Sequence, residues 1–256
     1  MKKRTIVPSV MSVILTIICV APFLYILLQS IVVDGTISLR SFYEAFFATP
    51  QYLARFWRSL ALCLCIAGGQ VFISVLGGYG FAKCKFRGRN TIFFLLMLLM
   101  IMPLQVTLVP NYLMLDKLGL LNTYYALALP MIFVPLGTFI MSQCFKAVPN
   151  ETIEAARLDG CRTPDVITRI LLPMNKSGLV CTVLLSFLDG WNMVEQPIVY
   201  LEEFSDYPIS VALATGASSN VSVKLACAVL VILPPLIMFL YYSQELVEGI
   251  AAGGEK

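Results

Sequence analysis

The sequence predicts an all-α membrane protein that crosses the bilayer six times. Of its 256 residues, 59% are hydrophobic and only 13% are charged, and apolar runs of membrane-spanning length recur along the chain. Soluble domains typically carry about 25% charged residues, so this chain lacks the polar surface that water requires. The mean hydropathy of +0.84 agrees. Apolar runs of about 20 residues cross a bilayer as helices, because only helices or closed barrels satisfy backbone groups in lipid.

The first predicted span, residues 8–33, follows Lys2, Lys3 and Arg4, as a signal peptide would. Its apolar run is about twice as long as the hydrophobic region of a signal peptide, and no small-x-small cleavage site follows it. We therefore interpret it as a true span. The other apolar runs are bounded by charged or turn residues. They predict spans at 57–81, 91–113, 124–145, 178–200 and 221–243.

The distribution of Lys and Arg predicts the orientation of the chain. With the N-terminus inside, 13 basic residues fall on the cytoplasmic side and five outside. Cytoplasmic loops carry the excess of basic residues, so both termini and the loop at 146–177 are expected in the cytoplasm. None of the eight cysteines falls in a predicted outer loop, and the chain has no histidine. We therefore expect neither a disulfide framework nor a metal site.

The loop at 146–177 is polar and predicts two short helices outside the bilayer. Asn150 is expected to cap the first helix, and Gly160 to end it in the left-handed conformation. Thr163 is expected to cap the second helix, and Pro173 to stop it. Glu154 and Arg157 lie three residues apart, so they can pair on one helix face or contact charged groups of a partner.

The same loop carries the most specific motif in the chain. Glu154-Ala155-Ala156 is followed by three residues, then Gly160, and then after nine more residues by an Ile-x-Leu-Pro run that ends at Pro173. This pattern resembles the cytoplasmic coupling loop of type-I ABC-importer permeases. The resemblance implies that the loop contacts an ATPase subunit through Glu154, Ala155, Ala156, Arg157, Asp159 and Gly160.

The resemblance covers nearly the whole chain. Trp191-Asn192 with Pro197 is similar to a signature of the carbohydrate-uptake (MalG-like) branch, and Gln244–Ile250 is similar to the tail of that branch. The chain departs from the family pattern at two places. Arg58 stands where the family usually has Asn, and the tail ends in Gly253-Gly254-Glu255-Lys256 instead of the usual basic ending. The implied organisation is a first helix and outer loop at 1–53, a type-I transmembrane core at 54–243 and a cytoplasmic tail at 244–256.

The resemblance also implies partners and a mechanism of alternating access. A dimer of ATPase subunits would bind ATP and Mg, a second, MalF-like permease chain would complete the pathway, and an extracytoplasmic binding protein would deliver a sugar or oligosaccharide. No phosphate-binding loop and no catalytic constellation occurs in this chain, so we expect a transport subunit without its own ATPase site and without a cofactor. No basic stripe interleaved with aromatics indicates a nucleic-acid partner.

Several polar residues fall inside predicted spans. Asp189 and Glu195 are ionisable, which is costly in lipid unless the groups face a cavity or a partner. Trp191 and Asn192 lie between them in the sequence. Gln105 lies two residues after Pro103, and its amide can donate to the carbonyl that Pro103, which has no N–H, leaves without a donor. Sugars are bound by aromatic stacking with polar side chains, so these residues are candidates for the pathway. They can equally bond to neighbouring helices or to the partner permease.

Other functions remain open at this point. A permease for polyamines, phosphate or amino acids would carry a similar loop. A secondary transporter would be expected to show an inverted repeat, which we do not find, and an intramembrane enzyme would need more than Asp189 and Glu195. The outer loops at 34–56 and 201–220 are candidates for contact with a binding protein, although solvated polar loops would look the same.

Overall fold

The computed structural model describes residues 6–33, 36–45, 50–214 and 221–254, and these are almost entirely helical. Lys2, Lys3, Arg4 and Lys256, which contribute to the predicted orientation, lie outside the described residues. A small hairpin joins the first two helices: β1 (Val32–Val33) pairs antiparallel with β2 (Thr36–Ile37). The all-α prediction therefore holds apart from this two-residue ladder.

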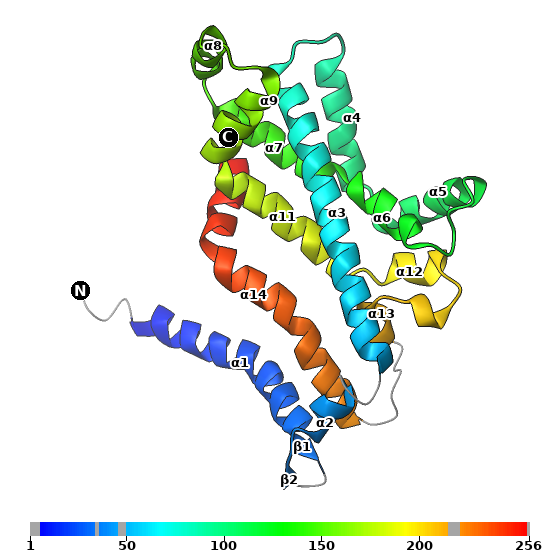
Figure 1. The fold of residues 1–256 in the computed structure, drawn as a ribbon. Coiled ribbons are helices and arrows are strands. Elements are labelled where there is room, and N and C mark those ends of the chain that lie inside the picture. Colours follow the sequence, from blue (N-terminus) through cyan, green and yellow to red (C-terminus); the bar gives the residue numbers. More distant parts are fainter. Residues whose placement is uncertain (1–5, 34–35, 46–49, 215–220, 255–256) are drawn as a thin grey trace.

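Three long helices form the frame of the molecule. They are α1 (Ile6–Ile31), α3 (Pro50–Lys83) and α14 (Val221–Gly254). In Figure 1, α3 runs along the molecule from the part that carries β1, β2 and α2 (Arg40–Tyr43) toward the part that carries α8 (Asn150–Leu158). We refer to these parts as the hairpin end and the α8 end. At 34 residues, α3 is long enough to cross a bilayer and continue beyond it.

The closest packing in the core joins α3 to the pair α6 (Tyr124–Ile132) and α7 (Pro135–Ala147). A Cβ atom added to Gly78 would lie 2.7 Å from the Cβ of Met141, and one added to Gly137 would collide with the Ser74 hydroxyl. Glycine at these positions therefore allows the helices to approach more closely than larger residues would. The close packing of α3 against α7 joins the middle of the molecule to the α8 end.

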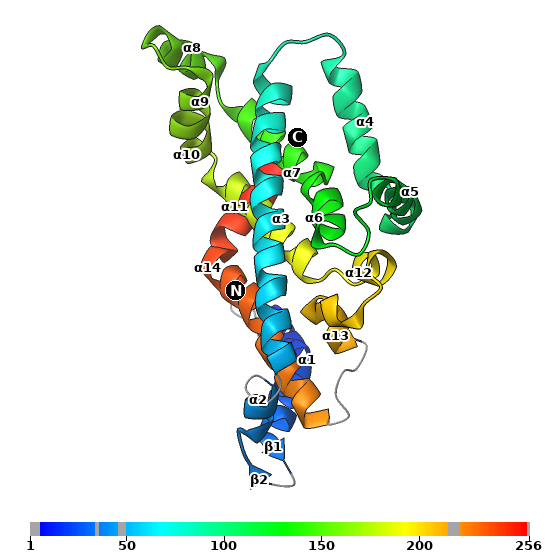
Figure 2. The ribbon, with the colours of Figure 1, turned by 45° about the vertical axis from the view of Figure 1, so that its right-hand side comes forward.

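The predicted third span, 91–113, is wrong as a continuous helix. The structure has α4 (Arg89–Ile101) and α5 (Leu104–Lys117), which meet at 106°. Pro103 has no N–H group and disfavours helical geometry at Met102, whose backbone is extended (φ −68°, ψ 127°). With 13 residues, α4 is about 20 Å long, shorter than a hydrocarbon core of about 30 Å. Figure 2 shows α5 turned sharply away from α4.

The predicted fifth span, 178–200, is also divided. Helix α11 (Lys176–Trp191) ends at Trp191, and a separate helix, α12 (Glu195–Tyr200), follows after three residues. Pro197 cannot donate to the carbonyl of Met193, and the Ser210 hydroxyl donates to that carbonyl at 2.7 Å instead. Beyond α12 lie the 3₁₀ turn η4 (Phe204–Asp206) and α13 (Ile209–Ala214). By length and hydropathy, four stretches of the described chain pass as spans, at Met11–Ile31, Tyr52–Lys83, Tyr124–Ala147 and Val221–Glu245. The number is six if two bent helix pairs each count as one span, namely α4 with α5 and Thr163–Met174 with α11.

The helices of the polar loop differ in detail from the prediction. Asn150 is the first residue of α8 rather than its cap, and Thr163 likewise begins α9 (Thr163–Asp165) one residue before the expected start. The Asp165 carboxylate accepts the Arg162 backbone N–H at 3.2 Å at this helix start. A π-helical stretch, η3 (Val166–Leu171), and α10 (Leu172–Met174) continue from α9. The helix therefore ends at Met174, one residue after Pro173, and the chain bends there by 88° into α11.

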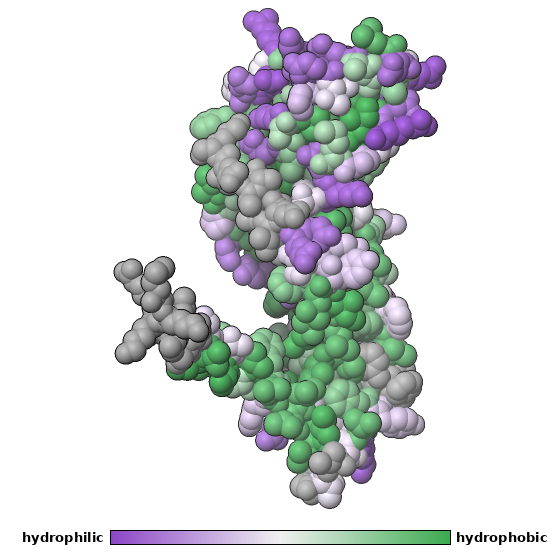
Figure 3. Space-filling view, turned by 90° about the vertical axis from the view of Figure 1, so that its left-hand side faces the viewer, coloured by the Kyte–Doolittle hydropathy of each residue, from purple (hydrophilic) through white to green (hydrophobic). Residues whose placement is uncertain are grey.

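The last helix bends where the apolar run gives way to the tail. Tyr242 in α14 has a non-helical backbone (φ −113°, ψ 17°), and residues beyond it, through Gly254, are helical again. Figure 3 shows hydrophilic residues gathered over the α8 end, whereas the hairpin half is largely hydrophobic. This polarity agrees with a molecule whose α8 end leaves the bilayer.

Candidate functional site

Helix α8 has one face in the core and one face in solvent. Ile153 and Ala156 are buried against a cluster that includes Phe145, Val166 and Leu171. Glu154, Ala155 and Asp159 are exposed, and so is Leu158, which retains 90% of its accessible surface. The two alanines of the motif therefore differ in environment, because Ala156 packs inward and Ala155 faces outward. Leu158 adds an apolar side chain to the exposed face.

Two basic side chains attach this loop to α3. Arg157 Nη2 donates to the Tyr79 hydroxyl at 3.2 Å, and Lys83 Nζ donates to the Asn150 side-chain oxygen at 3.0 Å. Lys83 also donates to the backbone carbonyl of Val148. No ion pair joins Glu154 to Arg157 in the described part of the chain. The carboxylate of Glu154 is therefore not drawn onto its own helix by Arg157.

The turn after α8 requires a glycine. Gly160 has φ +87°, in the left-handed region that side chains with a Cβ rarely adopt, as the sequence predicted. Its N–H donates to the Arg157 carbonyl at 3.1 Å, and the next N–H, of Cys161, donates to the Ala156 carbonyl at 3.0 Å. These bonds satisfy carbonyls at the end of α8 and fix the angle between α8 and α9.

Most of the predicted pathway residues gather at the break between α11 and α12. A cavity of about 430 Å³ is lined by the polar residues Asp189, Asn192, Glu195 and Gln196 together with apolar side chains, Leu104 of α5 among them. Gln105 Nε2 donates to both carboxylate oxygens of Glu195, at 3.0 and 3.2 Å. Gln105 thus bonds to Glu195 and not to a carbonyl freed by Pro103, which corrects the sequence interpretation.

Trp191 lies outside this cavity. Its side chain is buried, and its ring stacks on Phe187 with centroids 5.5 Å apart. The Phe56 ring packs against it nearly at right angles, with centroids 5.8 Å apart. The indole Nε1 donates to the Val231 carbonyl of α14 at 3.1 Å. The structure therefore places Trp191 between α3, α11 and α14, while its neighbour Asn192 faces the cavity.

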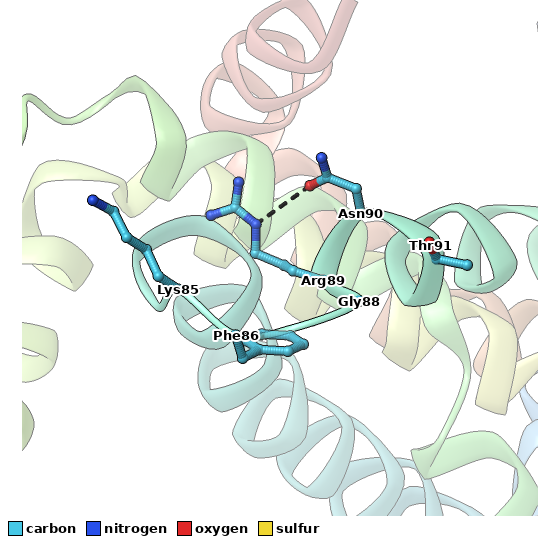
Figure 4. Close-up of a pocket in the computed structure, with 6 residues that line it drawn as sticks. All are labelled: Lys85, Phe86, Gly88, Arg89, Asn90 and Thr91. Atoms are coloured by element: carbon cyan, nitrogen blue, oxygen red, sulfur yellow. Dashed lines mark hydrogen bonds between the residues drawn. The ribbon is translucent and has the colours of Figure 1, made fainter.

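Two further cavities are lined mostly by other parts of the described chain. One of about 740 Å³ lies in the angle between α4 and α5, is mostly apolar, and shares Leu104 and Val134 with the cavity above. The other, of about 520 Å³, lies in the basic turn between α3 and α4, where Arg89 Nε donates to the Asn90 side chain at 3.4 Å (Figure 4). No predicted site residue lines the second of these cavities. It is lined by Lys85, Phe86, Gly88, Arg89, Asn90 and Thr91.

The segment around η4 is clamped to α3 by contacts that the sequence analysis missed. Arg55 is buried, donates to the Phe204 carbonyl at 3.0 Å, and lies 4.5 Å from the centre of the Phe204 ring. Arg58 pairs with Asp206 at 3.4 Å, and the Ser59 hydroxyl accepts the Ile209 N–H at 2.9 Å. The available signal was the Arg55–Arg58 pair at the start of an apolar run, because a basic residue there needs a partner.

With this geometry in view, comparison with known proteins identifies the family. A family model described as "Binding-protein-dependent transport system inner membrane component" matches residues 70–248, which contain α8 and the polar cavity. The chain belongs to this family. It is therefore a membrane-spanning permease subunit, located in the cell membrane, of a transport system that works with a solute-binding protein and an ATPase.

Several curated proteins are similar over most of their length. The arabinooligosaccharides transport system permease protein AraQ of Halalkalibacterium halodurans is 30% identical over 87% of this chain and 81% of its own. Protein LplC of Bacillus subtilis is 28% identical over 93% and 90%. The sn-glycerol-3-phosphate transport system permease protein UgpE of Yersinia pestis is 29% identical over 75% and 70%. The permease is thus similar to proteins that are named for different solutes.

A solved structure confirms the fold. A chain of a bacterial ABC transporter involved in the import of the acidic polysaccharide alginate superposes on the permease with a TM-score of 0.77. The superposition covers 94% of this chain and 95% of that chain, at 19% sequence identity. The type-I ABC-importer permease fold is therefore the fold of this protein.

Proposed function

We propose that the permease is one membrane subunit of an ATP-driven importer for a sugar or oligosaccharide. The observation that carries this proposal is the presentation of α8: Glu154, Ala155 and Leu158 face outward at the α8 end, while Arg157 and Lys83 hold the helix to α3. A helix that is exposed on one face and bonded to α3 on the other can transmit a displacement by a partner protein to the membrane-spanning helices.

In this arrangement the α8 end lies in the cytoplasm and contacts a separate ATPase dimer, which binds ATP and Mg. Glu154, Ala155, Arg157, Asp159 and Gly160 would form or shape the contact, whereas Ala156 would support it from the core. Closure of the ATPase dimer would move α8 together with α3. The membrane pathway would then open alternately to the two sides.

The solute pathway is assigned to the cavity at the α11–α12 break. Asp189, Asn192 and Glu195 would offer acceptors and donors to solute hydroxyl groups, and Gln105 would orient Glu195. Trp191 would support this cavity from behind rather than stack on a sugar ring, because its ring is buried against Phe187. A second, MalF-like permease chain would supply the opposite wall. A sugar as solute is supported by the similarity to AraQ.

The test is purification of the tagged permease from its native membranes in a mild detergent, with identification of co-purifying chains by mass spectrometry. We expect an ATPase and a second permease chain, and ATP-dependent sugar uptake when these are reconstituted with the binding protein. A permease that repeatedly purifies alone from several mild detergents, and a reconstituted complex that hydrolyses ATP without moving any solute, would each contradict the proposal.

A further inference from the structure

The cavity at the α11–α12 break is lined by two acidic side chains and by no basic one. Its lining includes the carboxyl groups of Asp189 and Glu195, and none of its lining residues is Lys or Arg. The larger apolar cavity that adjoins it at Leu104 and Val134 has no charged lining residue at all. Within the described part of the chain, this half of the pathway thus offers a solute two carboxyl groups and no cation.

The two carboxyl groups differ in what they already contact. Glu195 accepts the Gln105 amide through both oxygens, which is the arrangement that a carboxylate favours. Asp189 lies one helical turn before Met193, lines the cavity, and makes no hydrogen bond or ion pair with another described residue. Asp189 therefore has acceptor oxygens directed to no protein donor, and a solute in the cavity can supply the donors.

We infer that the permease passes neutral, hydroxyl-rich solutes and discriminates against anionic ones such as uronates and phosphate esters. Sugar hydroxyls donate to carboxylates, while the amides of Asn192 and Gln196 can donate as well as accept. An anionic group in the same place would lie beside two acidic side chains, and none of the residues that line the cavity is a Lys or Arg that could offset their repulsion. The inference rests on the proposed pathway and deepens it.

The solutes named for some relatives differ in charge from the solute inferred here. A relative is named for sn-glycerol 3-phosphate, and the superposed structure comes from an importer of an acidic polysaccharide. Both of those solutes are anions, whereas arabinooligosaccharides are neutral. Of these three solutes, the neutral one is the only one complementary to the carboxyl groups of Asp189 and Glu195.

The charge of the cavity can be measured without knowing the solute. In the assembled complex, with the accessible cysteines Cys19, Cys65, Cys84 and Cys161 replaced by serine, Asn192→Cys would place a thiol on the cavity wall. The probes are cationic 2-(trimethylammonium)ethyl methanethiosulfonate and anionic 2-sulfonatoethyl methanethiosulfonate. After correction for their reactivity with a free thiol, we expect the cationic reagent to react about tenfold faster or more.

Both carboxyl groups are then replaced by amides in one variant. Asp189→Asn combined with Glu195→Gln should bring the corrected ratio of the two reagents close to one. Asp116→Asn is the matched control, because Asp116 is an exposed acid on α5 that lines neither cavity, and it should leave the ratio unchanged. A ratio near one in the parent protein, or a ratio that survives the double substitution, would overturn the inference.

A transport measurement is the second test of the inference. In proteoliposomes with one binding protein, uptake of arabinotriose should exceed uptake of a trisaccharide of galacturonate, each corrected for occupancy of the binding protein. In the variant with both Asp189→Asn and Glu195→Gln, the ratio of arabinotriose uptake to galacturonate-trisaccharide uptake should fall about tenfold. An unchanged difference would contradict the role of Asp189 and Glu195. Absence of ATP-dependent uptake of any solute would instead contradict the proposed function, while the thiol measurement would still decide the charge of the cavity.

Discussion

Trp191 and Val231 are joined by a hydrogen bond of 3.1 Å from the indole Nε1 of α11 to a backbone carbonyl of α14. Val231 is four residues before Pro235, and a proline has no N–H to donate to that carbonyl. The indole thus satisfies an acceptor that the helix itself leaves free. The Ser210 hydroxyl does the same for the Met193 carbonyl, which Pro197 cannot reach. In each case a side chain compensates for a proline in an apolar setting.

Trp191→Phe should therefore destabilise the permease without changing its solute pathway. Phenylalanine can keep the stack on Phe187, but the Val231 carbonyl loses its donor, at a cost of about 1–3 kcal/mol. We expect a lower midpoint of thermal unfolding in detergent, and unchanged uptake for each folded transporter. Trp57→Phe is the control, because Trp57 is exposed and its loss leaves no carbonyl without a donor. Equal midpoints for the two variants would argue against this role.

How much of this architecture the sequence predicts depends on the element. The long helices α1, α3 and α14 follow the predicted runs, because hydropathy reports burial in lipid directly. Hydropathy does not report backbone breaks, so the bends at Met102–Pro103 and after Trp191 were missed although Pro103 and Pro197 marked them. Apolar residues continue on both sides of each break, and a window average therefore cannot separate the two helices.

The candidate sites show the same division. The spacing of the motif predicted the left-handed Gly160, because only local backbone geometry is involved. The bond between Gln105 and Glu195 joins residues 90 positions apart and follows from the bend at Pro103, so no local pattern contains it. The different environments of Ala155 and Ala156 also depend on tertiary packing, since either alanine could face inward in an isolated helix.

Leu158→Asp should weaken binding of the ATPase. The side chain is 90% exposed on the outward face of α8, so the substitution removes an apolar contact from the proposed interface without disturbing the core. Burying a leucine in a partner contributes about 1.5–3 kcal/mol, and a second negative charge beside Asp159 adds repulsion. We expect at least about tenfold less ATPase recovered per permease in the pull-down. Leu39→Asp, at an exposed site near the hairpin, should leave recovery normal.

Gly160→Ala should reduce transport more than it reduces the amount of permease in the membrane. At φ +87°, a Cβ atom costs about 1–2 kcal/mol, and relaxing this strain would turn α8 relative to α9. Gly80→Ala is the matched control, and Gly80 lies near the end of α3 that approaches the α8 end. No heavy atom lies within 4 Å of a Cβ added to Gly80, and the φ of Gly80 is not positive. Solute uptake should fall in the Gly160 variant only. Full uptake with normal ATPase coupling would show that this turn does not set the angle of α8.

Removing the hydrogen bond between Arg157 of α8 and Tyr79 of α3 should uncouple ATP hydrolysis from transport. Tyr79→Phe deletes the hydroxyl that accepts from Arg157, and Arg157→Met deletes the donor; each loses a hydrogen bond of about 1 kcal/mol. We expect each variant to hydrolyse ATP at a rate close to the parent rate while moving fewer solute molecules per ATP. If the two side chains act as one contact, the double variant should be no worse than either single one. Fully additive losses would mean that Tyr79 and Arg157 act separately, with Arg157 working through the ATPase alone.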